Sequence, residues 1–134
     1  MAEWIGIGRR ARRCYGFDEI ALVPGTVTLN PAEVDPAWEL HGLKFKVPFI
    51  ASAMDGVVDV TFAIAMGKLG GLAVLNLDGV QARYEDPAEA IEQIVRGEVE
   101  ETTNIVQKLY KAPIKETLIA KRVEEIKQAN VPCA

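Results

Sequence analysis

The alternation of hydrophobic and polar residues is most regular in the middle of the chain. A short apolar run, Pro48 to Ala53, is followed by Asp59 and by an apolar segment from Val60 to Leu69, which Gly70-Gly71 ends. Leu72 to Leu77 is a second apolar run. Short runs bounded by turn residues are typical of strands buried on both faces, Asp is a good helix N-cap, and glycine readily ends a helix. We therefore predict a βαβ unit with two parallel strands.

Weaker patterns lie on both sides of this unit. Trp38 to Leu40 and Leu43 to Val47 predict a short hairpin outside the main sheet. Gln81 to Pro87 is expected to be a polar loop, and Val131 to Ala134 resembles the beginning of a third strand. Helical periodicity predicts three further helices, over Ala88–Arg96, Glu98–Tyr110 and Lys115–Ala129. The expected organisation is a lead-in (1–47), the βαβ unit (48–77), a helical segment (78–130) and the strand start (131–134).

The apolar faces of the last two helices can be read from the same periodicity. Val99, Ile105, Val106 and Leu109 would face the core from the second helix. From the third helix the stripe consists of Leu118, Ile119, Val123 and Ile126.

Composition limits the classes of protein to which the chain can belong. The 134 residues are 49% hydrophobic and 25% charged, with a net charge of −4, as in a soluble globular domain. Nothing in this balance suggests a nucleic-acid partner. No apolar run approaches ~18 residues, so we expect no membrane span, and the N-terminus lacks the order of a signal peptide. Cys14 and Cys133 are far apart and form no metal or redox spacing, which favours a cytoplasmic location.

Several features outside the βαβ unit have an ordinary structural interpretation beside a functional one. Gly6 to Ala11 fits the loose dinucleotide pattern GxGxxA, but no strand of credible length precedes it. The neighbouring arginines predict a solvated basic face, with a phosphate or subunit contact as the alternative: Arg9, Arg10, Arg12 and Arg13. His41 is expected in a solvent-facing turn rather than in a catalytic or metal site. Cys14 is read as a bystander thiol and Cys133 as a small buried strand residue.

The ends of the two predicted strands are the best place to look for function. In parallel α/β folds, binding residues gather at the carboxyl ends of the strands, here Ser52 to Asp55 and Asn76 to Asp78. A hydroxyl can donate to a phosphate and a thioether packs well on an aromatic base. From the residues alone, the better explanation is that Met54 fills the core and Asp55 caps a turn.

Three segments resemble a known family. Tyr15 to Pro24 (YGFDEIALVP) resembles the FDDVLLVP segment of IMP dehydrogenases and GMP reductases, and Pro48 to Asp59 (PFIASAMDGVVD) resembles their PIISSPMDTVTE segment. Gly70 to Asn76 (GGLAVLN) resembles the GGIGFIH strand of the same family. All three occur in the right order and spacing. The loop Gln81 to Pro87 is similar to that of IMP dehydrogenase-related proteins, a branch that lacks CBS modules.

The resemblance implies a fold and a reaction. The family fold is a TIM (β/α)8 barrel, and this chain matches its N-terminal portion, with the helical segment from Pro87 to Ala129 where other members insert CBS modules. The implied reaction is hydride transfer between NAD or NADP and a purine nucleotide, IMP or GMP, through a covalent thioimidate on a cysteine. That cysteine and the monovalent-cation site beside it lie outside this chain, and neither Cys14 nor Cys133 matches the catalytic position.

Individual roles carry over only at the strand ends. By resemblance, Ser52 would reach the ribose-phosphate side of the nucleotide, Met54 would pack on the purine, and Asp55 would hold the loop or the ribose side. At the end of the second strand, where the family carries histidines or a His-Lys pair near the cofactor, this chain has Asn76-Leu77. Asn76 is therefore the expected cofactor contact, and the departure leaves NAD and NADP both open.

A barrel needs ~200 residues, so the chain is expected to be one piece of a larger enzyme, acting as a homo-oligomer. The alternative is a truncated, non-catalytic chain that persists as a binding or oligomerisation module. With only two strands, we also expect Ile50, Leu72 and Val74 to lack an opposite wall.

We predict that the purified 134-residue chain shows no hydride transfer with IMP or GMP and either nicotinamide cofactor, because the nucleophile is absent. The measurement is the absorbance of the reduced cofactor. Turnover that survives both Cys14→Ser and Cys133→Ser would contradict the assignment of the chemistry, and turnover lost in one of them would identify a cysteine wrongly dismissed.

Overall fold

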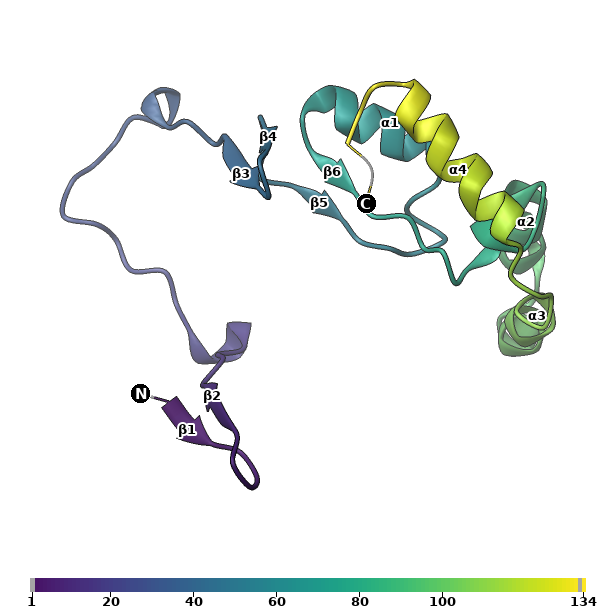
Figure 1. The fold of residues 1–134 in the computed structure, drawn as a ribbon, viewed down its shortest axis with the longest axis horizontal. Coiled ribbons are helices and arrows are strands. Elements are labelled where there is room, and N and C mark those ends of the chain that lie inside the picture. Colours follow the sequence, from purple (N-terminus) through teal and green to yellow (C-terminus); the bar gives the residue numbers. More distant parts are fainter. Residues whose placement is uncertain (1, 133) are drawn as a thin grey trace. The chain divides into compact units, whose positions relative to one another are not determined.

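The computed structural model describes residues 2–132 and 134 (Figure 1). The chain separates into two units, one ending at Val34 and the other beginning at Asp35. The boundary lies inside the segment that we expected to be a single lead-in. Between positions 3 and 34 only Ala11 is even partly buried, so this stretch has no core of its own.

The first unit contains one hairpin. β1 (Ala2–Trp4) pairs antiparallel with β2 (Arg10–Arg12), and the guanidinium of Arg10 lies 4.5 Å from the centre of the Trp4 ring. Gly6 and Gly8 have φ angles of 63° and 75° in the turn between the strands. The glycines of the GxGxxA pattern thus serve a turn, because glycine adopts positive φ at little cost. Two short 3₁₀ turns come next, η1 (Phe17–Glu19) and η2 (Pro31–Glu33).

The second unit begins with the expected hairpin and contains the βαβ unit. β3 (Trp38–Leu40) pairs antiparallel with β4 (Leu43–Phe45), and β5 (Ile50–Ala51) pairs in parallel with β6 (Leu72–Ala73). Between β5 and β6 runs α1 (Val60–Leu69), with the bounds that the sequence predicts. Asp59 caps this helix by accepting the Phe62 N–H at 2.6 Å, and Gly70 ends it at a φ of 91°.

The prediction that both strands are buried on both faces is wrong for β5. Ile50 is 51% exposed, whereas Leu72 in β6 is 5% exposed. The two strands differ in exposure because they have different neighbours in the sheet. β6 has β5 on one side, and on its other side the Leu75 N–H donates to the Ala134 carbonyl at 2.9 Å. Among the described residues, β5 has a strand neighbour on one side only. Ala134 thus lies beside the end of β6, but no third strand is assigned among the described residues, and Cys133 lies outside them.

The helical segment has its elements in the predicted order, with one correction. They are α2 (Pro87–Arg96), η4 (Val99–Glu101), α3 (Thr102–Leu109) and α4 (Glu116–Gln128), as Figure 1 shows. The predicted single helix from Glu98 to Tyr110 is divided into a 3₁₀ turn and α3. A 3₁₀ turn has three residues per turn, which removes Val99 from the helical stripe and leaves it 84% exposed.

Two apolar clusters hold the second unit together. In the first, Ile126 of α4 packs with Ala63 of α1 and Ala73 of β6, so that α4 and α1 lie together against β6 (Figure 1). The second joins Val80, Ala90 and Leu109. Val80 belongs to η3 (Val80–Ala82), a 3₁₀ turn that packs against both α2 and α4. This packing overturns part of the predicted polar loop, because it buries Gln81 to 1% exposure.

No helix in the described part of the chain is long and apolar enough to cross a membrane.

We expect the isolated chain to self-associate through the open edge of β5, because unpaired strand edges template pairing with other chains. The combined Phe49→Ser and Ile50→Ser variant removes two exposed apolar side chains at this edge, 63% and 51% exposed, and should shift the chain towards monomer in sedimentation. Val95→Ser is the matched control, because Val95 is 76% exposed and belongs to the helix α2 rather than to a strand. A wild-type chain that sediments as a 14.6 kDa monomer would contradict the prediction.

Candidate functional site

The loop after β5 folds into a compact turn. The Met54 N–H donates to the Ser52 carbonyl at 2.8 Å, and the N–H groups of Val57 and Val58 both donate to the Met54 carbonyl at 2.9 Å. Val58 is fully buried and anchors the turn in the first apolar cluster. Ser52 is exposed and Met54 is 53% exposed. In this chain Met54 therefore does not fill a core, and both side chains are available at the carboxyl end of the strand.

Asp55 connects this turn to three other segments. Its Oδ1 accepts a hydrogen bond from Asn76 Nδ2 at 3.1 Å, and its Oδ2 accepts one from the Val80 N–H at 2.9 Å. The Tyr110 hydroxyl, at the end of α3, also donates to Oδ2. The carboxylate of Asp55 thus joins the end of β5, the end of β6, η3 and the end of α3.

The backbone leaves this carboxylate little room. Gly79 is buried, and a Cβ atom placed on it would lie 1.9 Å from Asp55 Oδ1 and 2.3 Å from Oδ2. Distances below van der Waals contact cannot be accommodated without moving the backbone or the carboxylate. The Asp78-Gly79 turn therefore requires glycine because of Asp55 rather than because of its own φ, which is −99°.

Tyr110 is itself fixed from the other side by Arg83. The Arg83 guanidinium carbon lies 5.3 Å from the centre of the Tyr110 ring, and Arg83 also donates to the Ala112 carbonyl and forms an ion pair with Asp78 at 3.2 Å. The hydrogen bond to Asp55, with smaller effects of burial and of the negative charge of Asp55, raises the pKa of Tyr110 to about 12, while the charge of Arg83 acts in the opposite direction.

Asn76, the predicted cofactor contact, is half-buried at the end of β6. Its amide nitrogen donates to Asp55, and its amide oxygen accepts the Asp78 N–H at 3.1 Å. One N–H and one lone pair of the amide remain for other partners. The structure thus brings two predicted site residues, Asp55 and Asn76, into direct contact, and it places Ser52 and Met54 on the same turn as Asp55.

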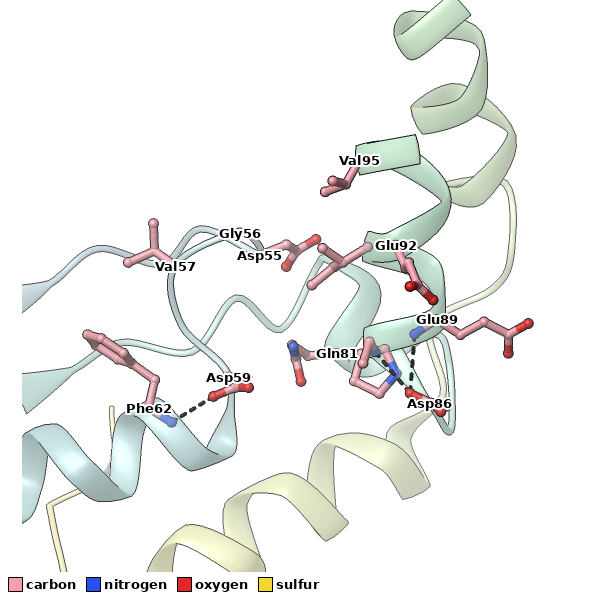
Figure 2. Close-up of a pocket in the computed structure, with 13 residues that line it drawn as sticks. Asp55, Gly56, Val57, Asp59, Phe62, Gln81, Asp86, Glu89, Glu92 and Val95 are labelled. Carbon is pink, nitrogen blue, oxygen red and sulfur yellow. Dashed lines mark hydrogen bonds between the residues drawn. The ribbon is translucent and has the colours of Figure 1, made fainter. Parts of the chain in front are cut away.

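A hollow of about 840 Å³ opens beside this cluster, between the beginning of α1 and the beginning of α2. Figure 2 shows Gln81 between Asp59 and Asp86, each of which caps a helix. The Gln81 amide nitrogen has no hydrogen-bond partner in the part of the chain that the structure describes. The residues that line the hollow include no Lys, Arg or His, so its wall is acidic and apolar.

Arg122 of α4 is the second buried polar residue that the sequence did not indicate, at 7% exposure. Its Nη2 donates to the carbonyls of Tyr84 and Glu85 at 3.3 and 2.8 Å, and its Nη1 lies 3.5 Å from Glu125 Oε2. Arg122 thereby holds the loop before α2 against α4.

The remaining candidates have no hydrogen bond to this cluster among those found in the described residues. His41 is exposed in the β3–β4 turn at a φ of 49°, and Cys14 is an exposed free thiol. Within residues 2–132 and 134, no group of three or more His, Cys, Asp or Glu side chains is arranged to hold a metal ion.

A parallel strand pair with polar residues at the strand ends is typical of binding sites in α/β folds, and comparison with known proteins identifies the family. Residues 14–133 match the model of the IMP dehydrogenase / GMP reductase domain. The chain belongs to this family.

Individual relatives are similar over between about half and nearly the whole of this chain. An uncharacterized oxidoreductase of Mycolicibacterium smegmatis is 38% identical over 97% of this chain and 36% of its own length. The inosine-5'-monophosphate dehydrogenase of Methanocaldococcus jannaschii is 39% identical over 49% of this chain and 13% of its own. The crystal structure of an IMP dehydrogenase/GMP reductase-like protein from Corynebacterium glutamicum superimposes with a TM-score of 0.80 at 33% identity, covering 98% of this chain and 37% of that one. The chain thus spans about a third of the length of the relatives that it matches end to end.

We predict that Gly79→Ala lowers the free energy of unfolding by about 1 to 3 kcal/mol, because the added methyl group forces Asp55 and the turn apart. Gly56→Ala is the control, since its Cβ would meet no atom within 4 Å and should change stability by less than about 1 kcal/mol. Urea titration at one fixed protein concentration measures both. Equal effects of the two substitutions would show that the Asp55 carboxylate is not confined as described.

We also predict that the Tyr110 hydroxyl loses its proton at a higher pH than an ordinary tyrosine. Because the folded-state pKa of Tyr110 is raised from about 10 to about 12, its contribution to stability is fully present below pH 10 and is lost as the pH rises through 12. Ultraviolet titration of the tyrosines should show a component near pH 12 that Tyr110→Phe removes and Asp55→Asn moves towards lower pH. A titration that Asp55→Asn leaves unchanged would contradict the assignment.

Proposed function

We propose that this chain is the N-terminal part of a TIM-barrel oxidoreductase that acts on a purine nucleotide, IMP or GMP, with NAD or NADP. The observation that carries the proposal is the match of residues 14–133 to the family domain. The exposure of Ser52 and Met54 at the carboxyl end of β5 agrees with it. The hydride transfer uses a cysteine that this chain does not contain.

In this proposal the turn after β5 binds the nucleotide. The Ser52 hydroxyl would donate to the ribose-phosphate side, and the exposed thioether of Met54 would pack on the purine. Asp55 has two proposed roles, to hold the loop or to bind the ribose. The three protein donors to Asp55 favour the role of holding the loop, because they already occupy most of the lone pairs of its carboxylate.

One residue of this chain, Asn76, fits a contact with a nicotinamide cofactor. A bound NAD or NADP would supply the hydride acceptor or donor. Asn76 retains one amide N–H and one lone pair beside its bonds to Asp55 and Asp78, which is enough for one donor and one acceptor contact to a carboxamide. The proposed monovalent-cation site lies outside this chain.

The second candidate is a non-catalytic binding or oligomerisation module. It is favoured by the apolar side chains that the chain exposes, among them Phe17 at 93%, Leu22 at 104% and Phe49 at 63%. Apolar surface of this kind is typical of an interface with another polypeptide.

A full-length chimera tests the proposed function. This chain would replace the matching 36% of the Mycolicibacterium smegmatis relative, and calorimetry would measure binding of IMP and of GMP, together with an absorbance assay with NAD and NADP. We expect binding of a purine nucleotide, weakened about 2- to 10-fold by Met54→Ala. A folded chimera that binds neither nucleotide would overturn the proposal and favour the module.

A further inference from the structure

The hydrogen bonds of Asp55 differ in where their donors come from. Asn76 and Val80 are 21 and 25 residues from Asp55 and lie at or just after the end of the βαβ unit. Tyr110 is 55 residues away and belongs to the helical segment formed by α2, α3 and α4. The bond from Tyr110 is therefore the polar contact through which this segment reaches the turn that carries Ser52 and Met54.

The end of α3 is held firmly enough to position another group. The Tyr110 N–H donates to the Val106 carbonyl at 2.9 Å, and the preceding residue, Leu109, is buried in the second apolar cluster. Arg83 lies against the Tyr110 ring and donates to the Ala112 carbonyl two residues further on. Side chains and backbone thus fix Tyr110 from both sides, while the Asp55 carboxylate that it contacts is confined by Gly79.

We propose that Tyr110 is a positioning residue for the nucleotide-binding turn: it holds Asp55, and through Asp55 it fixes the arrangement of Ser52 and Met54 that a purine nucleotide would contact. This inference rests on the proposed function. It assigns to the helical segment a direct influence on the site, exerted through one hydroxyl group. Tyr110 does not contact the nucleotide, and it acts through the loop alone.

Tyr84 offers a matched control. Its hydroxyl also donates to the end of α3, to the Leu109 carbonyl at 2.9 Å, and its ring packs in the second apolar cluster. Tyr84→Phe and Tyr110→Phe therefore remove the same chemical group from neighbouring positions, but only the second removes a bond to Asp55. A purely structural role would give the two variants similar effects.

The first measurement uses the 134-residue chain and requires no ligand. Hydrogen exchange of the Val57 and Val58 amides, which donate to the Met54 carbonyl, should become about 3- to 10-fold faster in Tyr110→Phe and stay unchanged in Tyr84→Phe. Equal rates at these amides in both variants would overturn the inference whether or not the chain binds a nucleotide.

The second measurement uses the chimera with the Mycolicibacterium smegmatis relative. Tyr110→Phe should raise the dissociation constant of the nucleotide about 3- to 10-fold, Tyr84→Phe should leave it unchanged, and Tyr110→Phe should add little in an Asp55→Asn background. If the unmodified chimera binds a nucleotide and Tyr110→Phe binds it equally well or more tightly, the positioning role is wrong while the proposed function stands. If the unmodified chimera binds no nucleotide, the proposed function fails, and the exchange rates still decide whether Tyr110 holds the turn.

Discussion

The carboxylate of Asp55 is the interaction on which the arrangement of the strand ends depends. Strand pairing alone gives β5 and β6 only two paired positions, Ile50 with Leu72 and Ala51 with Ala73. A pair this short does not fix the loops at the carboxyl ends of the two strands. Asp55 does so by accepting donors from the end of β6, from η3 and from α3 at once. Charge-assisted hydrogen bonds are stronger than neutral ones, and these three bring remote segments to one point.

Local chemistry explains why much of the fold could be predicted. The bounds of α1 are set by Asp59 as N-cap and Gly70 as C-cap, and α2 begins directly after Asp86 with Pro87 in its first turn. These signals act between residues that are near neighbours in sequence. Parallel pairing could be predicted in the same way, because a single helix between two short apolar runs leaves few other topologies.

The errors and omissions arise where distant packing decides. Gln81 has the sequence context of a polar loop, yet α2 and α4 cover η3 and bury it. Ile50 has the context of a buried strand, but its exposure depends on what lies beside β5. At the site, the sequence indicated Ser52, Met54, Asp55 and Asn76 as candidates. It did not indicate Tyr110, because nothing near Tyr110 marks a partner 55 residues away.

The separation of these donors along the chain also implies an order of events. The entropy lost on closing a loop grows with the logarithm of its length, so closing 55 residues costs roughly 0.9 kcal/mol more than closing 21. On this ground we expect the bonds from Asn76 and Val80 to close with the βαβ unit during folding and the Tyr110 bond to close after them. The contact from the helical segment would then be the first to be released from Asp55 when the folded chain opens locally.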